Sequence, residues 1–283
     1  MNPIKFLNTK LQKKFGKAYI KNLALNETRS VGLLKMVPEK SLVHFFSNVH
    51  SQIGQDGILA EIFKRLKINK GLFCEFGAWN GVYLSNCRKL FEEGWNGVFI
   101  ESNKKKFKAL ENEYRDFSNI KCIQECVGAP KYGIEGDRLI DIFNKHKLKK
   151  TELDFLSIDI DGPDLEVFEE IGMKPKVVLL EGGMNYDFTI EGRASDAIRD
   201  IYHHPLKEII KSVLEKGYIV VCSLHDCYLV RKDLAEVFPT YSTEELLDHG
   251  YNGAPLWLRK KIMLARKDYR LQIESDRLLS YLQ

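Results

Sequence analysis

One stretch of the chain, Leu72 to Asn86 (LFCEFGAWNGVYLSN), places an acid and two spaced glycines in and directly after an apolar run. The apolar residues suit a buried parallel strand. Gly77 and Gly81 then allow the backbone to turn and to approach a ligand where a Cβ would collide. A helix is expected next, with its free N–H groups directed at that ligand. The stretch therefore predicts a nucleotide-cofactor loop.

The glycine spacing separates two classes of cofactor. A dinucleotide-binding loop needs the pattern GxGxxG, whose close glycines admit a pyrophosphate, and the sequence lacks this pattern. An acid followed by spaced glycines instead resembles motif I of S-adenosylmethionine (SAM) methyltransferases. We therefore expect Glu75, Gly77, Gly81 and Ser85 to bind SAM. The alternative is a glycine-rich turn between a strand and a helix that binds no ligand.

A second acid follows the next apolar segment. Gly97 to Ile100 is typical of a short strand, and it ends at Glu101, twenty residues after Gly81. A carboxylate at the end of the second strand can accept hydrogen bonds from both hydroxyls of a ribose. NAD enzymes also place an acid here, so Glu101 predicts a ribose without choosing the cofactor. The alternative is an acid that ends a strand in solvent.

Strand and helix patterns alternate along most of the chain. The expected strands are 71–77, 97–101, 120–127, 153–160, 176–181, 218–224 and 227–231. The expected helices are 86–93, 104–114, 137–146, 164–171 and 205–216. This alternation predicts an α/β fold with a parallel sheet that helices cover on both faces. The last two strands are too close for a crossover helix, so they should pair antiparallel.

These elements together predict a Rossmann-like class I methyltransferase fold, which is a mostly parallel seven-stranded sheet with a terminal antiparallel hairpin. Helical extensions are expected at both ends. The predicted divisions are an N-terminal extension at 1–50, the methyltransferase domain at 51–239 and a C-terminal extension at 240–283. With 283 residues and 44% hydrophobic content, the chain can bury a sizeable core.

Several linked motifs resemble the FkbM-type SAM-dependent methyltransferases, over about Ser51 to Leu234. The segments that carry the resemblance are SQIGQDG (51–57), FCEFGAWNGVYLSN (73–86), EEGWNGVFIE (92–101), DFLSIDIDGPDLEVF (154–168) and YIVVCSLHDCYLVRKDL (218–234). The resemblance implies SAM as cofactor and O-methylation of a sugar, a polyketide or another small hydroxylated metabolite. Many members act in surface-glycan or natural-product pathways. We therefore expect a carbohydrate or surface-glycan precursor as the acceptor and a role in polysaccharide biosynthesis.

The first of these segments contains Gln55. In the family this segment packs near the methionine end of the cofactor, so the resemblance makes Gln55 a candidate cofactor ligand. Polar residues just before a helix are more often caps than ligands. Ser51 or Asp56 would suit as the cap of an expected helix at Gly57 to Leu66.

Methyl transfer to a hydroxyl needs a base that takes the proton or a cation that activates the oxygen. Asp159 and Asp161 end the fourth expected strand two residues apart, so they share one face and are candidate catalytic residues. Glu181 ends the fifth strand, and Asn185 follows it. Asp161, Glu181 and Asn185 form an oxygen-rich set that suits Mg²⁺, Mn²⁺ or Ca²⁺. Alternatively, Asp161 favours a helix N-terminus and Asp159 binds the ammonium group of SAM.

The terminal hairpin adds a histidine to the candidates. His225 and Asp226 occupy the tight link between the last two strands. The sixth strand should run parallel to the earlier ones, so this link should emerge at the same edge as Asp159. An imidazole is mostly neutral at pH 7, which makes His225 a candidate general base. A turn histidine without a role is the alternative, and His203 and His204 are expected in a loop on the substrate side.

Composition excludes several other classes of protein. No apolar run approaches the roughly 18 residues needed to cross a membrane, and the first residues lack the apolar block of a signal peptide. The net charge of +4 is mild and interspersed, so no nucleic-acid partner is expected. The six cysteines lie mainly in or beside apolar segments and are expected as buried thiols in a reducing compartment. A cytoplasmic protein is therefore expected.

The N-terminal segment has a pattern of its own. Apolar side chains recur at helical spacing, while lysines occupy other positions. The apolar residues are Ile4, Leu7, Leu11, Phe15 and Ala18, and the lysines are Lys10, Lys13, Lys14, Lys17 and Lys21. Such a basic amphipathic helix suits the inner face of an anionic membrane. It equally suits docking on its own domain or on a second subunit.

Two other functions compete with that of an O-methyltransferase. An NAD-linked oxidoreductase would use the same contact at Glu101. A catalytically inactive methyltransferase fold would serve as a binding subunit. The intact set of Glu75, Gly77, Gly81 and Glu101 argues against such a loss of activity.

Overall fold

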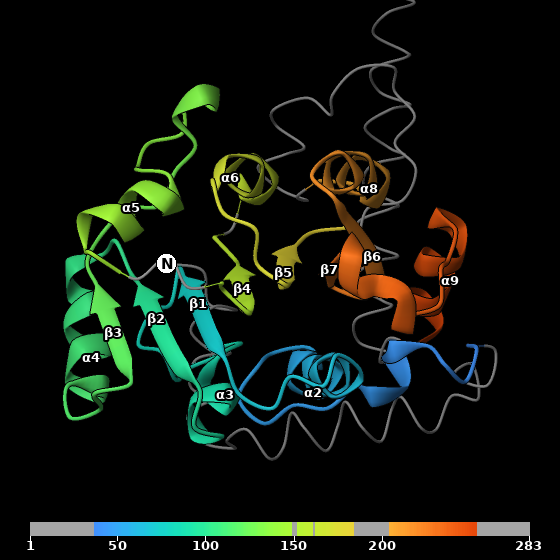
Figure 1. Cartoon of the computed structure of the whole chain (residues 1–283), viewed down its shortest axis with the longest axis horizontal. Coiled ribbons are helices and arrows are strands. Elements are labelled where there is room, and N and C mark those ends of the chain that lie inside the picture. Colours follow the sequence, from blue (N-terminus) through green and yellow to red (C-terminus); the bar gives the residue numbers. More distant parts are fainter. Residues whose placement is uncertain (1–36, 149–151, 161, 184–203, 254–283) are drawn as a thin grey trace, which may run out of the picture.

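The computed structural model describes residues 37–148, 152–160, 162–183 and 204–253, which form one twisted sheet with helices on both faces (Figure 1). The strands are β1 (Leu72–Phe76), β2 (Asn96–Ile100), β3 (Ile120–Ile123), β4 (Phe155–Ile158), β5 (Val177–Glu181), β6 (Tyr218–Ser223) and β7 (Asp226–Arg231). Their order across the sheet is β3-β2-β1-β4-β5-β7-β6. β7 is antiparallel to β5 and β6, whereas the other pairs are parallel. The predicted class I methyltransferase fold is confirmed.

Helices cover the two faces of this sheet in two groups. They are α2 (Gln55–Arg65), α3 (Arg88–Glu92), α4 (Lys104–Tyr114), α5 (Leu139–Lys145), α6 (Asp164–Glu170), α8 (Leu206–Glu215) and α9 (Thr243–Gly253), with 3₁₀ helices at Leu42–Phe45, Pro130–Tyr132 and Lys232–Val237. α2, α3 and α4 share one hydrophobic core with the sheet, and α5, α6 and α8 share the other (Figure 1). The sheet is therefore the middle of three layers.

The strands are continuous apolar runs because their successive side chains point to opposite faces of the sheet, and both faces are covered. Phe73 of β1 packs into the core with α2, α3 and α4, whereas Cys74 and Phe76 pack into the opposite core. Every residue of β4 and of β5 is buried. Successive side chains of a strand point to opposite faces, so a strand covered on both faces needs apolar residues throughout.

Several elements are shorter than predicted, and two of these differences affect the surroundings of the predicted loop and sheet edge. β3 stops at Ile123 and not at residue 127, because Val127 leaves the sheet edge and pairs with Asp137. The helix after the glycine loop begins at Arg88 and not at residue 86, so residues 77–87 form the loop. The backbone N–H groups nearest to Gly77 and Gly81 are therefore those of the loop and not those of a helix.

The start of α2 differs from the expected capping. The helix begins at Gln55 after Gly54, whose left-handed conformation has φ 85°. Asp56 does not cap the helix from in front, because it lies in the first turn. Its Oδ2 accepts hydrogen bonds from the backbone N–H groups of residues 49–51 and from the Ser51 hydroxyl, at 2.7–2.8 Å. Asp56 therefore folds the preceding segment back onto α2.

Segments at both ends of the described chain join the main cores. Val37, Val43 and Phe46 pack into the core that contains α2, and Leu246 of α9 packs into the opposite core. The predicted basic helix of residues 4–21 lies outside the described residues. None of the helices in the described ranges has the length and apolarity needed to span a membrane.

The expectation of buried cysteines is wrong for one thiol and partly wrong for another. Cys74, Cys87, Cys222 and Cys227 are buried, whereas Cys122 is half-buried and Cys126 is exposed. The reason is local, because β3 is the edge strand of the sheet and Cys126 follows the point where it ends. All six are free thiols.

Candidate functional site

The parallel strands deliver most of the predicted site residues to one edge of the sheet. Read along the strand order, the carboxyl ends of β2, β1, β4 and β5 lead into Glu101, Gly77, Asp159 and Glu181. Asp226 begins β7 and is the register partner of Glu181. Open α/β sheets bind ligands at this edge. The candidate site is therefore a row of residues along the carboxyl ends of β2, β1, β4 and β5 and the amino end of β7.

The two glycines of the loop serve close packing. Gly77 has φ 71°, and a Cβ there would lie 2.5 Å from the backbone oxygen of Asp159. Gly81 has φ 69°, and a Cβ would lie 2.5 Å from the ring of Tyr114. The Tyr114 hydroxyl also donates to the Gly81 oxygen at 2.5 Å. Gly77 thus lets the loop after β1 touch the loop after β4, and Gly81 seats the loop on α4.

A buried polar network supports the loop from below. Ser85 Oγ donates to Glu75 Oε2 at 2.6 Å, and the Asn86 backbone N–H donates to Glu75 Oε1 at 2.8 Å. Asn86 Nδ2 donates to the Ser157 hydroxyl of β4 at 3.0 Å. Burial raises the pKa of Glu75 to about 7, although the hydrogen bonds from Ser85 and Asn86 oppose the shift. The contacts of Glu75 and Ser85 therefore hold the loop in place.

Asn86 also presents an open acceptor. Its Oδ1 is buried and has no hydrogen-bond partner within the described part of the chain. A buried acceptor without a partner costs about 1–3 kcal/mol. A donor from a bound molecule at this point would remove that cost.

Glu101 is held by two backbone donors. The Trp79 N–H of the glycine loop donates to Oε2, and the Asn103 N–H donates to Oε1, both at 2.8 Å. The residue is only 4% exposed. A carboxylate has about four acceptor positions, so each oxygen retains capacity for one more donor. Glu101 is therefore fixed beside the loop, with acceptor capacity left on both oxygens.

Three carboxyl groups meet near the centre of the row. The pKa of Asp159 is raised well above its ordinary range, first by desolvation and then by the charges of Glu181 and Asp226. Asp159 also forms a hydrogen bond with Glu181, and this bond raises the pKa further. Asp159 is nevertheless exposed to solvent in part. The fold therefore brings three acids together at the centre of the row, and their proximity favours the protonated form of Asp159.

Asp164 shapes the loop that carries Asp159. Its carboxylate accepts from the backbone N–H of Ile160 at 2.9 Å and from that of Gly162 at 3.0 Å. The side chain is buried in the first turn of α6. This brace fixes the chain between β4 and α6.

His225 and Gln55 meet at Asp226. His225 Nδ1 lies 2.9 Å from Asp226 Oδ1, and Gln55 Nε2 donates to Asp226 Oδ2 at 2.7 Å. All three residues are buried. Gln55 thus contacts the first residue of β7, which lies 171 residues further along the chain.

The predicted metal ligands are described only in part. Asp161 and Asn185 lie outside the described residues, and Glu181 lies beside Asp159 and Asp226. Within the ranges that the structure describes, no group of three or more His, Cys, Asp or Glu side chains has the arrangement of a metal site.

His204 lies in the loop directly before α8, as predicted, but its side chain contacts two helices. The side chain is buried and lies between Glu166 of α6, at 2.9 Å, and Glu208 of α8, at 3.2 Å. Burial lowers its pKa, but the hydrogen bonds with the two glutamates outweigh burial and raise the pKa to about 9. His204 is therefore a charged link between two helices. His203 lies outside the described residues.

Sequence reasoning missed Asn86, Asp164 and the partnership of Asp226 with Gln55. Asp164 had a readable signal, because an acid in the first turn of a helix often binds preceding backbone N–H groups. The other two contacts join residues that are far apart in the sequence, and their types alone carry no such signal.

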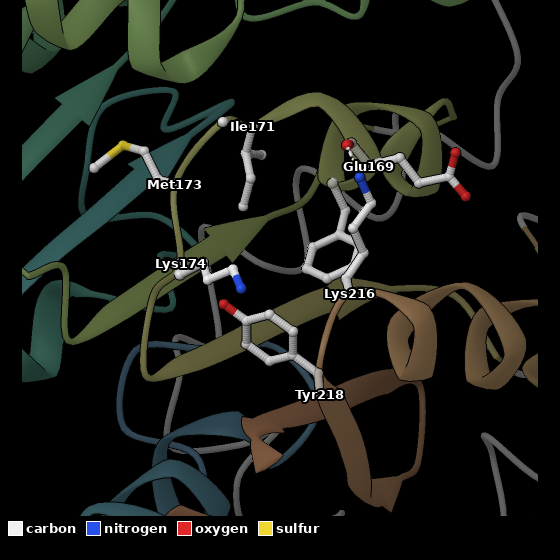
Figure 2. A pocket seen from close by; sticks show the side chains of 8 residues that line it. Glu169, Ile171, Met173, Lys174, Lys216 and Tyr218 are labelled. Carbon is white, nitrogen blue, oxygen red and sulfur yellow. Dashed lines mark hydrogen bonds between the residues drawn. The ribbon is translucent and has the colours of Figure 1, made fainter. Parts of the chain in front are cut away.

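A cavity of about 260 Å³ lies at the opposite edge of the sheet (Figure 2). Lys174 precedes β5, and Lys216 and Tyr218 lie where α8 leads into β6. Figure 2 shows the carboxylate of Glu169 directed away from Lys174. None of the predicted site residues lines this cavity. It is therefore separate from the row at the carboxyl ends.

Comparison with known proteins gives similarity of structure only. No family model and no curated protein match this sequence. The O-methyltransferase TomG from Streptomyces achromogenes, solved with SAM, is 12% identical with a TM-score of 0.43, covering 75% of this chain and 96% of its own. An O-methyltransferase from Bacillus cereus, solved with S-adenosylhomocysteine (SAH), is 13% identical with a TM-score of 0.40, covering 79% and 96%. The CurJ carbon methyltransferase is 11% identical with a TM-score of 0.42, covering 81% and 70%. The function must therefore be argued from the site residues.

Proposed function

We propose that this protein is a SAM-dependent O-methyltransferase. The observation that carries the proposal is Glu101, a buried carboxylate held by the Trp79 and Asn103 N–H groups beside the glycine loop. Its remaining acceptor positions match the two hydroxyls of a ribose. The open Oδ1 of Asn86 supplies a further acceptor in the same loop. The residues present therefore fit an adenosyl cofactor with a cationic amino-acid end.

The loop fits SAM better than NAD. In a GxGxxG pattern that begins at Gly77, glycines would also stand at positions 79 and 82. The chain has Trp79 and Val82 there, and the Trp79 side chain is 46% exposed. Such a side chain obstructs the close backbone approach that a pyrophosphate requires. An NAD-linked oxidoreductase is therefore the weaker proposal.

His225 is the proposed general base. When bound, SAM supplies an electrophilic methyl group whose bond to sulfur breaks with the electron pair left on sulfur. The acceptor hydroxyl oxygen forms the new bond to carbon and loses its proton to His225 Nε2. Asp226 balances the positive charge that the imidazole gains.

The acceptor that we propose is a hydroxyl of a carbohydrate or surface-glycan precursor. The support is the FkbM resemblance of the motifs between Ser51 and Leu234. Sugar hydroxyls are barely ionised near neutral pH, which agrees with a site that contains a base.

Binding of SAH tests the proposal directly. Replacement of Glu101 by Ala removes charge-assisted hydrogen bonds, each worth about 1.5–3 kcal/mol, so SAH should bind at least tenfold more weakly in calorimetry. Glu101→Gln keeps the shape and one acceptor oxygen, which one of the two backbone donors can use, and it should lose less affinity. Glu111→Ala, on the exposed face of α4, is the matched control. Unchanged SAH affinity in both Glu101 variants would remove the ribose assignment.

A thermal-shift comparison separates the competing functions. SAM and SAH should raise the melting temperature, whereas NAD should leave it unchanged. Stabilisation by NAD alone would favour the oxidoreductase. No response to any adenosyl ligand would favour an inactive fold that serves as a binding subunit.

Cation assistance is a separate part of the proposal, with Asp161, Glu181 and Asn185 as ligands. Carboxylate and amide oxygens suit Mg²⁺ or Mn²⁺. Addition of EDTA should then abolish methyl transfer, and Mg²⁺ or Mn²⁺ should restore it. Full activity in excess EDTA, with no metal found by elemental analysis, would leave His225 as the sole activating group.

A further inference from the structure

We propose that Asp226 and Gln55 are positioning residues that fix the tautomer of His225, an inference that rests on the proposed function. The three side chains form a continuous hydrogen-bonded chain from α2 to the hairpin link. Gln55 Nε2 lies 2.7 Å from Asp226 Oδ2, and Asp226 Oδ1 lies 2.9 Å from His225 Nδ1. This chain gives Gln55 a role other than that of a cofactor ligand.

The orientation of the Gln55 amide is set by its own backbone. The Ile53 N–H donates to Gln55 Oε1 at 2.5 Å, in the turn where Gly54 adopts its left-handed conformation. With Oε1 occupied by a donor, the NH₂ group must face the other way. Gln55 therefore presents a donor, and not an acceptor, to Asp226.

Asp226 transmits this orientation to the imidazole. An ionised carboxylate only accepts hydrogen bonds, so the nitrogen of His225 that faces it must carry the proton. The neighbouring acids Asp159 and Glu181 are not amide donors, so Gln55 is the side chain that donates to Asp226 Oδ2. The neutral imidazole is therefore held with hydrogen on Nδ1 and a lone pair on Nε2. That lone pair is the one that takes the proton of the acceptor hydroxyl.

A purely structural role would place no demand on the tautomer. Gln55 would then only link α2 to β7, and any residue that preserved packing would serve. The two roles differ in one measurable quantity, which is the position of the proton on neutral His225. Long-range ¹H–¹⁵N correlation spectra of ¹⁵N-histidine-labelled protein report that position.

The first test compares the wild-type protein with Asp226→Asn. Spectra are recorded near pH 8.5, where imidazoles are mostly neutral. His225→Gln identifies the His225 signals among the seven histidines of the chain. Wild-type His225 should be protonated on Nδ1. In Asp226→Asn, Gln55 still presents a donor, so the new amide oxygen at position 226 must turn to Gln55 and the new NH₂ group must face the imidazole. His225 should then switch to the Nε2–H tautomer.

The second test reverses the chain. In the double variant Gln55→Glu with Asp226→Asn, residue 55 accepts from both the Ile53 N–H and the amide NH₂ at position 226. The amide oxygen at position 226 then faces the imidazole, and the Nδ1–H tautomer should return. The double variant keeps the net charge of the cluster. Rescue by such an exchange cannot result from packing alone, because each single amide or carboxylate has nearly the same shape.

Three outcomes would overturn the proposal. They are an Nε2–H tautomer in the wild type, an Nδ1–H tautomer in Asp226→Asn, and an Nε2–H tautomer that persists in the double variant. The wild-type measurement stands even where a variant does not fold, which circular dichroism would reveal. Calorimetry with SAH is independent of these spectra. A wild-type protein with the expected tautomer but without SAH binding would contradict the proposed function and leave the positioning chain intact.

Discussion

At the scale of single residues, the site depends on carboxyl groups whose surroundings differ. Glu101 lies against two backbone donors, whereas burial raises the pKa of Glu75 from 4.5 to about 7. A raised pKa means that the folded protein binds the proton of Glu75 more tightly than the unfolded chain does. The stabilisation from protonated Glu75 is therefore complete below about pH 4.5 and is lost as the pH rises through about 7.

Glu75→Gln should remove this dependence on pH. The amide has no proton to lose, and its oxygen can still accept from the Asn86 N–H. Relative to wild type, the variant should gain about 1–3 kcal/mol in free energy of unfolding between pH 4.5 and 8. Urea denaturation across this range, at constant ionic strength, measures the difference. Glu111→Gln on the surface is the control, and a constant difference between Glu75→Gln and wild type would contradict the assignment.

At the scale of elements, His204 joins the helices on one face of the sheet. It links Glu166 of α6 to Glu208 of α8, and its backbone oxygen accepts from the Gly183 N–H at 2.9 Å. Gly183 and His204 are the described residues on either side of segment 184–203. His204 therefore links α6 to α8 and also binds Gly183, which follows β5.

His204→Gln should weaken this link only while the histidine is charged. The pKa of His204 is raised from 6.5 to about 9, so its stabilisation is complete below about pH 6.5 and is lost as the pH rises through about 9. The variant should be less stable than wild type by about 1–3 kcal/mol at pH 6 and nearly equal at pH 10. Chemical denaturation at both pH values checks this, with Lys211→Gln on the exposed face of α8 as control. An equal deficit at both values would show that packing, and not charge, accounts for the effect.

At the scale of the whole molecule, the N-terminal segment has the most distinctive distribution of charge. The net charge is only +4, yet residues 10–21 contain five lysines at positions that leave an apolar helical face free. We propose that this segment contacts an anionic membrane. It would place the enzyme beside acceptors that are attached to lipid or assembled at the envelope.

Co-sedimentation with liposomes tests membrane contact. The full chain should bind vesicles that contain anionic lipid, and binding should fade at high salt because each lysine near the surface contributes about 1 kcal/mol. Replacement of the five lysines by Gln should reduce binding sharply, whereas a matched set of five substitutions on exposed lysines of the folded domain should not. Equal partitioning of all three proteins, insensitive to salt, would exclude this helix as the anchor.

The sequence by itself determined most of the elements and the positions of the main candidates. Alternating apolar segments predicted all seven strands, because burial on both faces of a sheet leaves a local signal in each strand. Gly77 and Gly81 predicted a turn after the first strand, and both adopt positive φ values there; their packing against Asp159 and Tyr114 appeared only in the structure. The position of Glu101 was also predicted, since an acid directly after a short apolar strand can be recognised from neighbouring residues alone.

Only the tertiary structure decided which polar groups meet. Antiparallel pairing of β7 with β5 places Asp226 opposite Glu181, and the turn before α2 aims Gln55 at Asp226 from 171 residues away. The ion pairs of His204 likewise appeared only in the structure, because α6 and α8 pack on the same face. Such contacts depend on strand order and helix packing, which join distant segments. Residue types and spacing identify the candidate residues. Which of these residues contact one another is decided by the fold.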